Sequence, residues 1–280
     1  MAFPMSNHRI EVNGVQFRVV EDGRGPAVLL LHGFPDSSRL WRHQIPALVA
    51  AGYRTIAPDL RGFGESDKPG EIEAYALPLL LGDVIGVMDK LNADRARVVA
   101  HDWGAAIGWM LAGMYPDRVE RFAALSVGHL NSFANAGIEQ REKSWYMLLF
   151  QFRGVAEEAL SRNDWRLFRE WTRAHPEAEQ WIADLSRPGA LTAALNWYRA
   201  NAAPEALFSE PQPFPAIPAP TLGVWSSADA YLTEQQMLGS GEHVTGPWRY
   251  ERIEGASHWL QLDQPERLNR LLIDFLGNDR

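Results

Sequence analysis

The sequence predicts an α/β fold with a mostly parallel sheet that is interrupted by a helical cap. In residues 1–130, short apolar runs alternate with amphipathic stretches, which is the pattern of right-handed βαβ units. From 131 to 215 the pattern is helical, and aromatic residues are denser than the 11% of the whole chain. The strand pattern then resumes. We therefore expect a core in two parts, 1–130 and 216–280, with the cap domain at 131–215.

Composition and charge exclude several classes of protein. The 280 residues are 46% hydrophobic with a net charge of −8, so the chain can bury a large core but lacks the basic surface that nucleic acids require. Having no Cys, it cannot hold disulfides, Fe–S clusters or a Cys nucleophile. Its histidines form no metal-binding set. Neither a membrane span nor a signal peptide is evident. We expect a cytoplasmic protein with no metal site, nucleic-acid partner or membrane attachment.

The first part of the core contains six predicted strands. Asn13-Gly14 joins the first two and is a strong signal for a β-hairpin. The third is a continuous apolar run, typical of a strand buried on both faces. The predicted strands are 9–12, 15–20, 27–31, 54–57, 97–100 and 119–127, and the predicted helices between them are 38–51, 77–91 and 105–115.

The second part of the core follows a proline-rich segment. Five prolines between 210 and 220 predict a stiff, extended return linker. Strands at 221–225 and 248–253 and a helix at 264–276 complete the pattern. Because ligands bind at the carboxyl ends of parallel strands, the residues that follow 27–31 and 97–100 should face one crevice.

One of these strand ends has the pattern of a nucleophile elbow. Ala100 and Gly104 lie two positions either side of Asp102, between a predicted strand and a predicted helix. Small flanking residues permit the sharp turn that exposes a central nucleophile. That nucleophile is usually Ser, and a carboxylate instead can attack an sp³ carbon and form an alkyl ester. We expect His101 beside it to support the turn.

Hydrolysis of such an ester needs a base that activates water. His258 follows the last predicted strand, and Asp229 follows the strand before it. An imidazole base needs a carboxylate to orient it. The order Asp102, Asp229, His258 therefore predicts a catalytic triad.

These residues resemble the Asp-nucleophile branch of the α/β-hydrolase fold, and most closely the soluble epoxide hydrolases. The resemblance spans nearly the whole chain and implies an α/β-hydrolase core with a mostly parallel eight-stranded sheet and an inserted helical cap. The matching motifs are His32-Gly33-Phe34-Pro35, Asp59-x-Arg61-Gly62-x-Gly64-x-Ser66, His101-Asp102-Trp103-Gly104-Ala105, Leu195-Asn196-Trp197-Tyr198-Arg199 and His258-Trp259.

The resemblance also implies roles for individual residues and a substrate class. Tyr146 and Tyr198 of the cap would hydrogen-bond the epoxide oxygen and protonate it. The backbone N–H groups of Phe34 and Trp103 would form an oxyanion hole. No cofactor is needed, and the partner would be a small apolar epoxide. The residues expected to line its pocket are Trp41, Trp145, Phe150, His129 and Trp259.

Two other functions stay open at this point. A haloalkane or haloacid dehalogenase would use the same Asp nucleophile and a Trp after it to hold halide. However, the chain departs from those families at Phe34, Ala106 and Tyr146. A non-catalytic ligand-binding protein on a hydrolase fold would typically lack a triad residue, and this sequence has all three. A serine esterase is excluded by Asp102.

Overall fold

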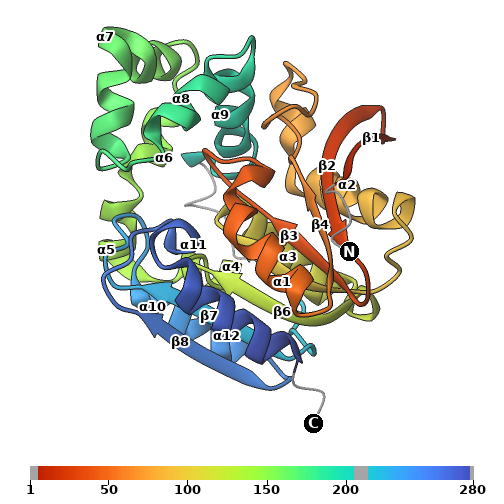
Figure 1. Ribbon diagram of the computed structural model, residues 1–280. Coiled ribbons are helices and arrows are strands. Elements are labelled where there is room, and N and C mark those ends of the chain that lie inside the picture. Colours follow the sequence, from red (N-terminus) through yellow and green to blue (C-terminus); the bar gives the residue numbers. More distant parts are fainter. Residues whose placement is uncertain (1–5, 205–213, 278–280) are drawn as a thin grey trace.

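The protein is built around one eight-stranded sheet. The structure is a computed structural model, and it describes residues 6–204 and 214–277. Its strands are β1 (Ser6–Val12), β2 (Val15–Gly23), β3 (Ala27–Leu31), β4 (Arg54–Pro58), β5 (Ala96–His101), β6 (Val119–Leu125), β7 (Thr221–Ser226) and β8 (Trp248–Ile253). They lie in the order β1-β2-β4-β3-β5-β6-β7-β8 (Figure 1). The pairs β1–β2 and β2–β4 are antiparallel, and all other neighbours are parallel. The predicted mostly parallel eight-stranded sheet is confirmed.

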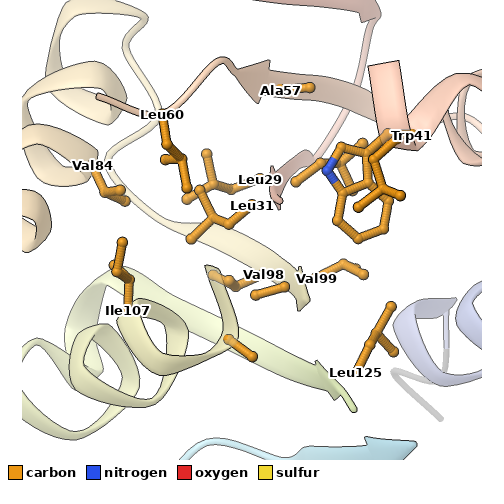
Figure 2. Close-up of a cluster of buried hydrophobic side chains, with 14 of the residues drawn as sticks. Leu29, Leu31, Trp41, Ala57, Leu60, Val84, Val98, Val99, Ile107 and Leu125 are labelled. Carbon is orange, nitrogen blue, oxygen red and sulfur yellow. The ribbon is translucent and has the colours of Figure 1, made fainter. Parts of the chain in front are cut away.

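Helices cover both faces of this sheet. α1 (Gln44–Ala50) and α12 (Pro265–Gly277) pack together on one face, and α2 (Leu77–Lys90) and α3 (Trp103–Met114) pack on the other (Figure 1). Figure 2 shows Leu29, Leu31 and Val98 facing Val84 of α2 and Ile107 of α3. The central strands are apolar on both sides because neither face meets water. Shorter elements are η2 (Ile72–Tyr75), η3 (Pro116–Arg118), α10 (Glu234–Leu238), η5 (Gly239–His243) and α11 (Leu260–Asp263).

The prediction of one continuous helix at 38–51 is wrong. The segment forms a 3-10 helix, η1 (Ser38–His43), and then α1. Pro46 explains the change, because it has no N–H to donate and its ring would clash with the carbonyl of Arg42 in a continuous α-helix. The α-helix can begin only within one turn of the proline.

A run of helices separates β6 from β7 in the chain. They are α4 (Leu130–Ala134), α5 (Gly137–Lys143), α6 (Trp145–Phe150), α7 (Val155–Trp171), α8 (Ala178–Leu185) and α9 (Ala190–Asn201). In Figure 1, α6 to α9 gather beside the core in green and teal. The backbone of α7 leaves helical geometry between Arg162 and Trp165. The division of the chain at 130 and 215 stays a prediction, and part of the predicted proline-rich linker, 210–213, lies outside the described residues.

The two edge strands of the sheet carry charged side chains held in ion pairs. On β8, Arg249 pairs with Glu251 at 2.7 Å and with Asp274 at 2.6 Å. Arg252 of the same strand pairs with Glu234 at 2.9 Å. β1 presents Arg9 at the opposite edge. Both outer edges of the sheet are therefore polar.

Among residues 6–204 and 214–277, no helix is long and apolar enough to cross a bilayer.

Candidate active site

Asp102 lies in a strained turn between β5 and α3. Its φ is 53° and its ψ is −125°, a conformation that L-residues rarely adopt. The turn brings Gly104 against the end of β3. A Cβ at Gly104 would lie 2.4 Å from the carbonyl oxygens of both Leu31 and His32. Close backbone contact thus requires a glycine two residues after Asp102.

A methyl group at this glycine should be costly. We expect Gly104→Ala to lower the free energy of unfolding by roughly 3 kcal/mol, because neither backbone carbonyl can move aside without disturbing β3. Chemical denaturation would measure the change. Gly70→Ala is the matched control, since a Cβ at Gly70 meets open space. Equal stability of the two variants would contradict the packing argument.

His258 and Asp229 reach Asp102 from the loops that follow β8 and β7. His258 Nδ1–H donates to Asp229 Oδ2 at 2.9 Å, and its Nε2 lies 3.5 Å from Asp102 Oδ2. Asp229 Oδ1 accepts the backbone N–H groups of Tyr231 and Leu232 at 2.8 and 3.0 Å. The structure therefore brings the three predicted triad residues together in one buried chain of contacts.

The charges of this group are strongly coupled. Burial disfavours the imidazolium, but the carboxylates of Asp229 and Asp102 outweigh burial and raise the pKa of His258 to about 10. Burial also disfavours the Asp102 carboxylate, yet His258 outweighs it and lowers the pKa of Asp102 below its ordinary value. Both pKa shifts favour an imidazolium at His258 beside an Asp102 carboxylate.

Backbone donors already contact the Asp102 carboxylate. The N–H of Phe34 donates to Oδ1 at 2.7 Å, and the N–H of Trp103 also stabilises the charged form. Phe34 precedes a cis peptide bond to Pro35. A Cβ at Gly33 would lie 2.2 Å from Asp102 Oδ1, so only glycine lets the backbone at position 33 come this close to the carboxylate. Of the two carboxylate oxygens, Oδ2 is the one left for other chemistry.

The two predicted tyrosines lie together beside this carboxylate. Tyr146 comes from α6 and Tyr198 from α9, and their ring centroids are 5.9 Å apart. The ring of Tyr198 also lies 5.6 Å from Phe34 and 5.1 Å from Trp103. Burial, and then the charge of Asp102, raise the pKa of both phenols well above the ordinary value. Both therefore remain protonated across the usual pH range.

Comparison with known proteins places the chain in a family. The family model described as alpha/beta hydrolase fold matches residues 26–265. The chain belongs to this family. The hydrolase is 34% identical to Epoxide hydrolase A of Mycobacterium tuberculosis, over 95% of this chain and 96% of that protein.

Solved structures agree with this assignment. The crystal structure of Epoxide Hydrolase A from Mycobacterium thermoresistibile has a TM-score of 0.80 at 34% identity, covering 98% of the hydrolase and 99% of that chain. A Bacillus megaterium epoxide hydrolase in complex with an inhibitor has a TM-score of 0.88 at 28% identity, covering 97% and 100%. The protein is therefore an epoxide-hydrolase-like enzyme of the α/β-hydrolase fold.

Two aromatic residues of the hydrolase's site were missed by sequence reasoning. Trp171, at the end of α7, lies 5.4 Å from Phe34 and 5.3 Å from Tyr146 between ring centroids. Tyr231 lies 5.3 Å from His258, and its hydroxyl donates to the carbonyl of Trp171 at 2.5 Å. Neither residue belongs to a local motif. The only available signal was that Tyr231 stands two residues after Asp229.

The residues predicted to line the hydrolase's pocket divide into two groups. Phe150 lies 4.9 Å from the Tyr198 ring, and Trp259 lies 5.3 Å from His258, so both are part of the site. The structure does not bring the other three to it. Trp41 is buried in the hydrophobic core (Figure 2), Trp145 is 52% exposed, and His129 stacks on His243 at 4.1 Å.

The position of His129 has a clear physical cause. Ser126, the residue after β6, has a φ of 67°, so the chain turns directly beyond the strand. The next backbone N–H groups are then bound elsewhere: Gly128 donates to Gln236, and His129 donates to Ser240 Oγ at 2.8 Å. His129 thus follows a strand end, as predicted, but faces α10 and η5.

A pocket of about 430 Å³ reaches His258 of the predicted triad from one side. It lies between the turn that joins α7 to α8 and the loops that follow β7 and β8. Its lining includes Tyr231, His258 and Trp259. Within the described residues no group of three or more His, Cys, Asp or Glu could hold a metal ion.

Proposed function

We propose that the hydrolase opens a small apolar epoxide to a vicinal diol through an ester of Asp102. The observation that carries this proposal is the pair Tyr146 and Tyr198, two protonated phenols that lie together within reach of the Asp102 charge. The printed names of its relatives, which are epoxide hydrolases, support the same substrate class. We propose that residues 131–215 act as the cap that supplies these phenols.

In the first step, Asp102 Oδ2 would attack an epoxide carbon. A new C–O bond forms as the ring C–O bond breaks, and the electron pair stays on the ring oxygen. That oxygen takes a proton from Tyr146 or Tyr198. The phenol suits this task because its ordinary pKa near 10 lies between those of water and an alkoxide. The aromatic rings of Phe150, Trp171 and Trp259 would hold the apolar part of the substrate.

Ester formation itself would prepare His258 to act as a base. Burial opposes the imidazolium, and the Asp102 charge is one of the forces that keep it protonated in the resting site. Once Asp102 is a neutral ester, that force is gone and the pKa of His258 falls. The released proton restores the phenol that was used in ring opening, so the charges balance.

In the second step, neutral His258 would take a proton from water, and the hydroxide attacks the ester carbonyl. The oxyanion that develops on Oδ1 is held by the N–H groups of Phe34 and Trp103. Collapse breaks the bond to the substrate alkoxide, which takes the remaining hydroxyl proton. The products are the diol, the Asp102 carboxylate and the His258 imidazolium, as in the resting site.

Trapping the ester tests the proposal. His258→Gln should attack substrate but not hydrolyse the ester, because glutamine cannot accept the proton of water. Incubated with an aryl epoxide, this variant should gain the full mass of the epoxide, measured by intact mass spectrometry. His258→Gln combined with Asp102→Ala is the control and should gain nothing.

Other adducts would decide between the alternatives. A dehalogenase would gain an alkyl group from a bromoalkane, without its halogen, and nothing from the epoxide. The structure offers little for halide, since the ring of Trp103 packs against Tyr198 and Trp197. No adduct from either compound, with both left intact by the wild-type protein, would favour a non-catalytic ligand-binding protein.

A further inference from the structure

We infer that Arg199 is a positioning residue that fixes the relative position of α6 and α9, the helices that carry Tyr146 and Tyr198. The inference rests on the proposed function, in which both phenols serve ring opening. Arg199 follows Tyr198 directly on α9. Its Nε donates at 2.9 Å to the carbonyl of Phe150, the last residue of α6, which lies one helical turn after Tyr146. One guanidinium therefore links the helices that carry both phenols.

The same guanidinium pairs with a half-buried carboxylate, that of Glu157. Glu157, in the first turn of α7, accepts from both terminal nitrogens of Arg199, at 2.8 and 2.9 Å. The Arg199 side chain is only 4% exposed, and that of Glu157 is 19% exposed. Glu157 also accepts the N–H of Gly154 at 2.8 Å. Because a bidentate pair has a fixed geometry, α7 holds the plane of the guanidinium that α6 and α9 share.

α6 depends on such outside support. It has six residues, too few for a helix that is stable by itself. The last carbonyls of any helix lack partners within the helix, and Arg199 supplies one for Phe150. Gln151 supplies a second link, donating to the carbonyls of Met147 and Tyr198 at 3.1 and 3.2 Å. Without the Arg199 contact, the end of α6 that carries Phe150 would be held less firmly against α9.

The proposed mechanism separates this role from general stability. Tyr146 and Tyr198 act when the ester forms, whereas ester hydrolysis uses His258, Asp229 and the oxyanion hole. None of the hydrogen bonds of Arg199 involves the triad. A loss of its positioning should therefore slow ester formation and leave ester hydrolysis unchanged, while a general loss of structure would slow both.

Arg199→Lys is the test variant, because lysine keeps the charge but cannot bind Phe150 and both Glu157 oxygens at once. Build-up of the aryl-epoxide adduct would be followed by rapid quench and intact mass in the His258→Gln background. Decay of the adduct would be followed in protein that keeps His258. We expect build-up to slow by about tenfold or more, as for a misplaced reacting group, and decay to change by less than about twofold. Arg166→Lys is the matched control, since its pair with Glu170 is exposed on the same helix as Glu157.

Equal slowing of both steps, or an unchanged build-up, would overturn the inference. Glu157→Gln provides a second variant should Arg199→Lys fail to fold, because it weakens the Arg199–Glu157 pair but leaves the Arg199 contact to Phe150 in place. It should slow build-up by a smaller factor, again without affecting decay. Tyr198→Phe in the same assay separates the two proposals. If it leaves build-up unchanged, the assignment of the phenols fails. If it slows build-up and neither the Arg199 nor the Glu157 variant does, only the role of Arg199 fails.

Discussion

Replacing Asp102 with alanine is expected to abolish turnover. Asp102 Oδ2 is the proposed attacking atom, and it lies 3.5 Å from His258 Nε2. Among the described residues, no other carboxylate at the end of β5 contacts that nitrogen. Loss of a nucleophile from a triad removes the reaction path itself, so diol formation should fall by at least about 10⁴-fold. Steady-state assays of diol formation would measure the loss, and intact mass should find no adduct.

The control for this variant is a carboxylate outside the site. Asp117→Ala, on the exposed face of η3, should leave turnover within about twofold of wild type, as is usual for surface substitutions. Alanine, like aspartate, has a Cβ and is strained at the positive φ of residue 102, so circular dichroism should first show that Asp102→Ala is folded. Residual activity above about one tenth of wild type would show that Asp102 is not the nucleophile.

Removing both phenol hydroxyls should produce the second largest loss. Tyr146→Phe or Tyr198→Phe alone should slow ring opening by roughly ten- to a thousand-fold, by analogy with the loss of one oxyanion donor, and the double variant should be slower still. The rings keep their packing, so the change isolates proton donation. Single-turnover adduct formation in the His258→Gln background would measure it.

The matching control is a buried tyrosine elsewhere in the core. Tyr53 is 6% exposed and precedes β4, so Tyr53→Phe should leave ring opening unchanged. If the double phenylalanine variant loses less than about threefold in rate, the phenols are not the acids. Another proton donor near Asp102 would then have to serve ring opening.

Much of the fold follows from local sequence patterns. All predicted strands are present, and a short continuous apolar run such as Ala27–Leu31 favours a strand that is covered on both faces. The hairpin at Asn13-Gly14 is also present, with both residues at positive φ. The helix at 38–51 was predicted as one element because its apolar spacing continues through Pro46, and the effect of that residue depends on where the helix begins.

Parts of the site could be predicted for the same reason. Asp102, Asp229 and His258 each lie just beyond a strand, and parallel strands bring their carboxyl ends to one edge of the sheet. Trp171 and Tyr231 could not be found this way, because their places depend on how α7 packs against the loop after β7. His129 shows the converse. It follows a strand end too, but its loop is captured by Gln236 and Ser240, which are more than 100 residues away in the sequence.

The charged edges of the sheet bear on how this enzyme tolerates high concentration. An unprotected outer strand offers a row of backbone N–H and C=O groups on which a second molecule can continue the sheet, and this is one route to insoluble aggregates. To pair with β8, an incoming strand would have to displace or bury the ion pairs of Arg249 and Arg252. The cost of removing those charges from water opposes such growth. Sheet extension at β8 is therefore disfavoured in the folded protein, which lowers the risk of edge-to-edge aggregation at high concentration.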